Sequence, residues 1–180
     1  QKAHPYSSSW YTWPIMLKPI GYYFSSREVL STGGVQTTVF NSVHLLPNPA
    51  LYLFSMMAIL IMSLKWMSSF SKVLTTKTYG SEFAISSLIL LGFYANFLPW
   101  AFVSRSAFLY HYQPASGFAF LALGFLLYKV GLKPEIQYKF LYLLVLFLIV
   151  AAFLYWLPLQ LGLDIDRDSF YNRMWRKSWI

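Results

Sequence analysis

One short segment of the sequence gathers side chains that could bind a phosphate. Between two uncharged apolar stretches, Arg105 is followed by Tyr110, His111 and Tyr112. A guanidinium can form two parallel hydrogen bonds with a phosphate, and phenol and imidazole groups can also donate hydrogen bonds. The segment is therefore a candidate anion-binding site at the membrane surface. The alternative is that Arg105 reaches lipid headgroups while the tyrosines belong to an aromatic belt at the membrane surface.

Other common chemistries lack the residues that they need. The chain has no cysteine, which excludes thiolate metal sites and cysteine nucleophiles. His4, His44 and His111 are far apart and lack the spacing of a metal site, so we expect no metal or other cofactor. Aspartates alternate from Asp164 to Asp168, where a solvated segment leaving the membrane is the expected role rather than acid–base catalysis. His4 and His44 are expected to fill turn or interface positions.

The composition indicates a membrane protein. Of the 180 residues, 57% are hydrophobic and 11% are charged, and the mean hydropathy is +0.49. Ordinary globular proteins carry roughly 25% charged residues, and a soluble chain of this length could not bury so much apolar surface. The net charge of +8 comes from 14 Lys and Arg residues against 6 acidic ones. We assign this excess to loops that face the cytoplasm or anionic lipid, and expect no nucleic-acid partner.

Uncharged stretches locate the membrane-spanning segments, because about 20 apolar residues cross the hydrocarbon core. They predict an all-α membrane protein whose domain of residues 47–160 contains four transmembrane helices: about 47–66, 83–103, 114–130 and 139–160. Pro99 lies late in the second stretch and is expected to kink or end that helix. Pro114 is expected to begin the third helix.

The loops between the spans predict the orientation of the chain. Loops 65–82 and 129–139 lie on one side and are dense in lysine, which places them in the cytoplasm. Residues 1–46, an aromatic segment suited to the membrane interface, the turn 104–114 and the tail 161–180 are then external. The expected location is the plasma membrane, or the endoplasmic reticulum membrane if the chain is eukaryotic.

Four blocks of the sequence resemble motifs of protein O-mannosyltransferases, family 39 of the glycosyltransferases, and occur in the family's order. Residues 9–20 (SWYTWPIMLKPI) resemble the Trp-x-Trp-Pro-Leu-x-Leu-Arg-Pro block, and residues 47–50 (PNPA) resemble Gly-Asn-Pro at the start of a span. Residues 104–115 (SRSAFLYHYQPA) resemble Arg…Phe-Leu-His/Tyr-His-Tyr-x-Pro-Ala. Residues 174–180 (MWRKSWI) resemble the Met-Trp-x-x-Ser-Trp ending of bacterial members.

Three positions depart from the family pattern. Lys18 stands where arginine is usual, and Pro47 stands where glycine is usual, but both blocks remain recognisable. Tyr110 stands where eukaryotic members often have a first histidine, which favours the bacterial branch of the family.

The resemblance implies the C-terminal four-helix portion of a larger C-type glycosyltransferase fold. Such enzymes transfer mannose, with inversion, from polyprenyl-phosphate-mannose or its dolichyl counterpart to Ser and Thr hydroxyls of exported proteins. The partners would be this lipid donor, the acceptor protein, membrane lipid and an N-terminal half of the same enzyme. The family's catalytic acidic residue belongs to that half, so no catalytic residue is expected in this chain.

The candidate site residues then fall into two groups. One group would hold the lipid phosphate or the sugar: Arg105, Tyr110, His111 and Tyr112. The other group would lie over the outer mouth of the bundle and shape the sugar or acceptor site: Trp10, Trp13, Pro14 and Asn48.

Other functions remain open at this point. A non-catalytic four-span scaffold would use the aromatic segments only as interfacial anchors. A transporter fragment is disfavoured, because transport pathways usually place charged residues inside the spans and these spans lack them. A related transferase, such as an aminoarabinose transferase of the same fold, would use another sugar donor.

Overall fold

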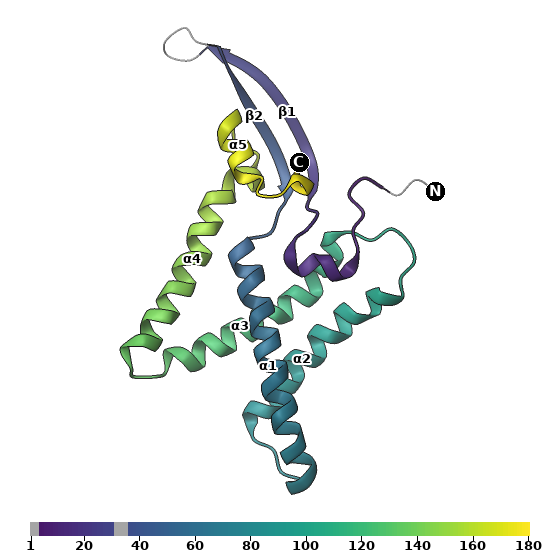
Figure 1. Cartoon of the computed structure of the whole chain (residues 1–180), viewed down its shortest axis with the longest axis vertical. Coiled ribbons are helices and arrows are strands. Elements are labelled where there is room, and N and C mark those ends of the chain that lie inside the picture. Colours follow the sequence, from purple (N-terminus) through teal and green to yellow (C-terminus); the bar gives the residue numbers. More distant parts are fainter. Residues whose placement is uncertain (1–3, 31–35) are drawn as a thin grey trace.

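A computed structural model describes residues 4–30 and 36–180 of the chain. Residues 1–3 and 31–35, within the predicted external segment 1–46, lie outside the described residues. Helices dominate, with a small antiparallel sheet at one end (Figure 1). The elements in chain order are η1 (Trp10–Ile15), β1 (Ile20–Leu30), β2 (Gln36–Leu45), α1 (Pro49–Thr76), α2 (Ser81–Phe97), η2 (Leu98–Phe102), η3 (Leu109–Tyr112), α3 (Gln113–Gly131), α4 (Ile136–Leu161), β3 (Ile165–Asp166), α5 (Arg167–Arg173) and η4 (Lys177–Trp179).

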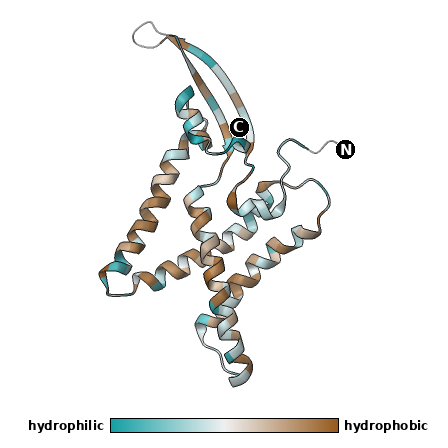
Figure 2. Ribbon diagram, in the orientation of Figure 1, coloured by the Kyte–Doolittle hydropathy of each residue, from teal (hydrophilic) through white to brown (hydrophobic). Residues whose placement is uncertain are grey.

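Four helices are long and apolar enough to cross a membrane, as the sequence predicted. Figure 2 shows them as mainly hydrophobic, whereas the hairpin of β1 and β2 and helix α5 carry hydrophilic stretches. Three predicted ranges agree with the structure within a few residues. The first is too short, because α1 continues past Lys65 to Thr76. Its 28 residues measure roughly 42 Å at 1.5 Å per residue, longer than the hydrocarbon core.

Prolines lie at helix ends, as expected for Pro99 after α2 and for Pro114 in the first turn of α3. Asn48, predicted to shape the sugar or acceptor site, also forms a helix cap. Asn48 caps α1, where its side chain accepts a hydrogen bond from the backbone N–H of Leu51, and Pro49 occupies the first turn. Helix α2 ends at Phe97, and the 3-10 helix η2 that follows contains Pro99. These ends place the connection between α2 and α3 at the same end of the molecule as the sheet (Figure 1).

The core lies among α1, α2 and α3, where small residues allow close helix contact. Ala58 of α1 and Ala115, Ala119 and Ala122 of α3 are at most 2% exposed. Helix α4 is different: 6% of its most apolar window is buried, against 22–28% in the other three helices. Its buried residues, Trp156 and Leu159, lie near its C-terminal end, where the helix packs against the rest of the chain.

The predicted interfacial segment contains a β-hairpin that the all-helical prediction did not include. β1 pairs with β2 from Ile20–Leu45 to Leu30–Gln36, and the short β3 pairs with β2 on the other side. Aromatic and β-branched residues are frequent in both long strands, as suits a half-buried sheet. The prediction of four helical spans concerns the membrane region and is confirmed there.

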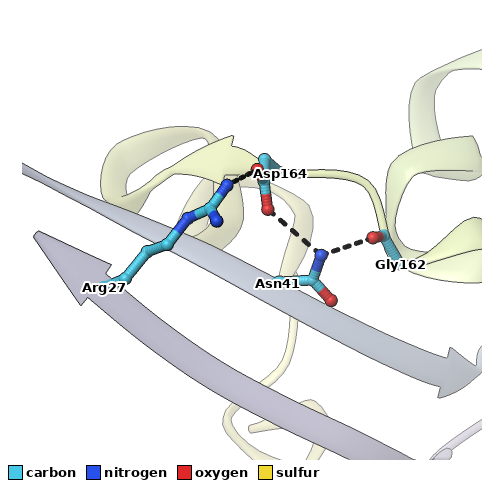
Figure 3. Close-up of polar contacts among 4 residues, drawn as sticks. All are labelled: Arg27, Asn41, Gly162 and Asp164. Atoms are coloured by element: carbon cyan, nitrogen blue, oxygen red, sulfur yellow. Dashed lines mark hydrogen bonds and ion pairs between the residues drawn. The ribbon is translucent and has the colours of Figure 1, made fainter. Parts of the chain in front are cut away.

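A polar cluster fastens the hairpin to the chain that follows α4 (Figure 3). Arg27 of β1 forms an ion pair with Asp164. Asn41 of β2 donates hydrogen bonds to the Gly162 carbonyl oxygen at 2.6 Å and to Asp164 Oδ1 at 3.1 Å. The aspartates expected to be merely solvated therefore include one that joins two distant parts of the sequence.

Asp166 also has a structural role, because it caps α5. Its Oδ1 accepts a hydrogen bond from the Ser169 backbone N–H at 2.8 Å. Hydrogen bonding to Ser169 lowers the pKa of the Asp166 carboxyl, so the charged cap is favoured. Both aspartates thus act in positioning the outer segments, and neither needs a catalytic role.

We predict that Asn41→Ala loosens the docking of the hairpin on the tail. Two hydrogen bonds are lost, worth about 2 kcal/mol at about 1 kcal/mol each, so amide exchange around Phe40 and Ile165 should accelerate about thirtyfold. Hydrogen exchange followed by mass spectrometry measures this rate. Thr37→Ala, at an exposed position of the same strand, is the control and should leave exchange unchanged. Equal exchange rates in the two variants would contradict the role of the Asn41 hydrogen bonds in holding the hairpin to the tail.

Candidate functional site

Arg105 of the predicted phosphate-binding group lines an open pocket of about 450 Å³, here called the arginine pocket, whereas Tyr110, His111 and Tyr112 are not among its lining residues. Its walls come from residues 7–11, which precede and begin η1, and from residues between 100 and 107, which connect α2 to η3. The Ser8 backbone N–H donates to the Ala107 carbonyl oxygen at 2.9 Å and joins the two walls. Two predicted residues, Trp10 and Arg105, therefore meet in one pocket although 95 positions separate them.

The chemistry of the arginine pocket suits an anion. Arg105 is the cationic residue among the described residues that line it, and none of those residues is acidic. Its guanidinium carbon lies 5.8 Å from the centroid of the Trp100 ring, a cation–π distance that restrains the exposed side chain. Hydroxyl groups that can donate hydrogen bonds surround it: Ser7, Ser8, Ser9, Ser104 and Ser106.

A stack of aromatic rings supports this pocket from within the protein. The Trp13 side chain is 1% exposed, and its indole N–H donates to Ser8 Oγ at 3.0 Å. The His111 ring packs nearly parallel to the Trp13 ring at 6.1 Å and is tilted against the Trp100 ring at 4.3 Å, and the two tryptophan rings lie 5.4 Å apart, edge to face. Pro14 is buried with Trp13 in η1. Trp13 and Pro14 are thus buried beneath the outer surface, not spread upon it as we expected.

Both backbone groups of Phe108 lie next to one ring nitrogen of His111. The Phe108 backbone N–H donates to His111 Nδ1 at 3.0 Å, and the Phe108 carbonyl oxygen lies 3.0 Å from the same nitrogen. The first contact needs the Nε2–H tautomer of a neutral imidazole and the second needs the Nδ1–H tautomer, so the contacts alone do not assign the proton. In the Nε2–H tautomer, His111 presents a donor while Nδ1 is held by the backbone of the turn.

The two tyrosines of the predicted segment lie in different surroundings. Tyr110 is 40% exposed, and its ring centroid lies 4.3 Å from that of His111. Tyr112 is 2% exposed and packs against Tyr52 of α1 and Phe97 of α2. Burial leaves Tyr112 a core residue, so placing it in the phosphate-binding group was wrong for this arrangement. The turn of η3 directs the two side chains apart.

Asn48 lies outside the arginine pocket. Besides capping α1, its Nδ2 donates to the Ile149 carbonyl oxygen of α4 at 2.8 Å. It lines a second pocket together with Gln113 and Gln160.

The sequence reasoning missed Trp100, which lines the arginine pocket. Its position directly after Pro99 and five residues before Arg105 could have indicated it.

The comparisons with known proteins agree on one family. The model described as the "C-terminal four TMM region of protein-O-mannosyltransferase" matches residues 1–179. The polyprenol-phosphate-mannose–protein mannosyltransferase of Mycolicibacterium smegmatis is 28% identical over 98% of this chain and 33% of its own length. The dolichyl-phosphate-mannose–protein mannosyltransferase 5 of Candida albicans is 25% identical over 98% of this chain and 25% of its own length.

A solved structure shares the fold. The S. cerevisiae protein O-mannosyltransferase Pmt1–Pmt2 complex bound to the sugar donor matches with a TM-score of 0.75 and 23% identity, over 99% of this chain and 24% of that chain. This chain spans about a third of the length of the mycobacterial relative. With four apolar helices in the predicted places and a family match along almost its whole length, the chain belongs to the C-terminal four-transmembrane region of the protein O-mannosyltransferase family.

Proposed function

We propose that this chain is the donor-binding, C-terminal portion of an enzyme that transfers mannose from polyprenyl-phosphate-mannose to Ser and Thr hydroxyls of exported proteins. Its family membership and the printed names of its relatives support this activity. The observation that carries the proposal is the arginine pocket, which combines Arg105 with serine hydroxyls at the end of a membrane-spanning helix. A sugar linked to a membrane lipid through phosphate would present its phosphate at this depth.

In the proposed reaction Arg105 holds the donor phosphate and stabilises the leaving group. The acceptor hydroxyl attacks the anomeric carbon of mannose, and the bond from that carbon to the phosphate oxygen breaks. The bonding electrons pass to the phosphate oxygen, so the negative charge of the phosphate grows by one as the phosphate departs. A guanidinium already in position would stabilise this charge more in the transition state than in the ground state.

His111 and the aromatic stack have a supporting role in this proposal. The Nε2–H of His111 would donate to the phosphate or to a sugar hydroxyl, with the ring held by Trp13 and Trp100. Tyr110 would contribute its phenol beside it. The base that takes the acceptor proton would be a carboxylate from another part of the full-length enzyme. The acceptor oxygen would then attack the anomeric carbon from the face opposite the phosphate, which inverts the configuration of that carbon.

We further propose that the outer face carries η1, the hairpin, the arginine pocket and the C-terminal tail. The lysine-rich connections 65–82 and 129–139 would then face the cytoplasm, in agreement with the positive-inside rule. The bacterial features of the sequence support a location of the full-length enzyme in the plasma membrane, with acceptors arriving from the export pathway. The endoplasmic reticulum membrane would be the equivalent location in a eukaryotic cell.

We predict that Arg105→Ala lowers the turnover of the full-length enzyme about a hundredfold, equivalent to about 3 kcal/mol of transition-state stabilisation. Arg105→Lys should recover only part of the rate, because the ammonium keeps the charge but loses the two-pronged geometry. The measurement is mannosyl transfer to a Ser/Thr peptide, normalised to inserted protein. Arg176→Ala removes an exposed cation elsewhere on the chain and is the control. Wild-type rates for both Arg105 variants would remove this residue from the site.

A second prediction separates hydrogen bonding by His111 from its packing. His111→Phe retains a ring in the aromatic stack but removes the Nε2–H donor, so kcat should fall about tenfold, the effect of losing one hydrogen bond to a charged group. Trp13→Phe, which keeps an aromatic ring in the same stack, serves as the packing control and should retain most of the rate. If the two variants lose the same activity and the same thermal stability, His111 acts through packing alone.

The proposed orientation is tested with single cysteines, because this chain contains none. In a full-length protein otherwise free of cysteine, Ser7→Cys should react with a membrane-impermeant thiol reagent in intact cells. Ser71→Cys, in the extension of α1, should react only after the membrane is permeabilised. The reverse labelling pattern would overturn the orientation without bearing on the activity.

A further inference from the structure

A groove without charged residues lies on the outer part of the molecule, apart from the arginine pocket. It consists of two adjoining pockets that share Tyr22 and His44, and we call it the Tyr22 groove. One pocket, of about 380 Å³, lies between the start of β1 and helix α5. The other, of about 600 Å³, lies between the end of β2 and the starts of α1 and α3.

A β-bulge places Tyr22 where the two pockets meet. Gly21 pairs with His44 and Tyr23 pairs with Val43, so Tyr22 is an extra residue in β1. Such a bulge redirects a side chain away from the regular alternation of the strand. The Tyr22 side chain is 62% exposed and lines both pockets, so its ring and its hydroxyl are available to a ligand or partner.

Gly21 allows the aromatic wall to close over the strand. A Cβ atom at this position would lie 2.8 Å from the Tyr6 hydroxyl and 3.5 Å from His44 Nε2. The missing side chain of Gly21 leaves room beside the strand for the Tyr6 phenol and the His44 imidazole. Tyr6, Gly21 and His44 together line one wall of the groove.

The lining of the Tyr22 groove favours a neutral ligand. None of the described residues that line the two pockets is acidic, lysine or arginine. Burial lowers the pKa of His44, which favours its neutral form. Near the groove, the Arg167 guanidinium carbon lies 5.9 Å from the centroid of the Tyr171 ring, and Arg27 pairs with Asp164 on the hairpin (Figure 3). The described lining itself presents no charged side chain to a ligand.

The two halves of the groove offer different contacts, and together they suit a polypeptide. The half beside α5 is aromatic, with Tyr22, Phe24 and Tyr171 among its residues, and would pack against proline rings and threonine methyl groups. The half beside α3 carries the carboxamide of Gln113, which can both donate to and accept from a peptide group, and the carboxamide of Gln160. The Gln160 amide already donates to the Leu46 carbonyl oxygen at 3.1 Å, so its Oε1 remains as an acceptor.

The groove also ends next to the proposed donor site. Gln113 is the first residue of α3 and follows η3 directly, and η3 carries His111 of the aromatic stack. A chain lying in the groove would therefore reach the donor site from the α3 side of η3. We propose that the Tyr22 groove binds an extended, uncharged segment of the acceptor polypeptide; this inference rests on the proposed mannosyl transfer.

The first test measures acceptor affinity in the full-length enzyme. For a neutral peptide of Ser, Thr and Pro residues, Tyr22→Ala should raise the peptide KM about tenfold by removing an aromatic contact, while kcat and the donor KM remain within about twofold. Tyr128→Ala is the matched control, because this tyrosine is 63% exposed and lies near the lysine-rich end of α3. An unchanged peptide KM in Tyr22→Ala, or an equal change in both variants, would overturn the proposal.

A charge placed in the groove gives a result that a structural role would not produce. Gln113→Glu should raise the KM of a peptide carrying glutamate beside its acceptor threonine and lower the KM of the same peptide carrying lysine. Changes of the same sign for both peptides would overturn the groove as the acceptor site, as would a change confined to the KM of polyprenyl-phosphate-mannose. If the wild-type enzyme transferred no mannose to any peptide, the proposed function itself would fail, and peptide KM values could not be obtained.

Discussion

The outer part of this protein depends on the burial of one aromatic side chain, Tyr112. It packs against Tyr52, Phe93 and Phe97 where α1, α2 and α3 converge, and it is 2% exposed. Because the residue lies at the end of η3, its burial fixes that turn on top of the helical core. Arg105 of the arginine pocket precedes this turn in the sequence, and Gln113 of the Tyr22 groove follows it directly.

This arrangement gives η3 a position between two kinds of surface. On one side, a cation and hydroxyl groups suit the phosphate of a lipid-linked donor. On the other side, an uncharged aromatic and carboxamide surface suits a polypeptide. In the proposed inverting transfer, the acceptor approaches the sugar from the face opposite the leaving group. Separate surfaces before and after η3 are compatible with such an approach under that proposal.

The sequence was sufficient for the membrane helices but not for side-chain directions, and the role of the segment with Arg105 stays a prediction. Charged residues bracket the apolar stretches, so the four spans could be located within a few residues, except where α1 continues beyond Lys65. Consecutive side chains of a 3-10 helix point about 120° apart, so Tyr110, His111 and Tyr112 could not all face one ligand. Only the fold determines which of them is buried.

The hairpin was missed because its aromatic residues do not alternate cleanly along β1, where the bulge at Tyr22 breaks the period of two. The same irregularity is what opens the Tyr22 groove. Arg105 is kept apart from the acidic residues. Among the described residues, no ion pair involves Arg105, so its guanidinium remains available to a phosphate. A carboxylate in the same pocket would pair with it and oppose anion binding. An enzyme that needs both a cation for the leaving group and a base for the acceptor is therefore served by carrying them on different parts of its fold, with the substrates between them.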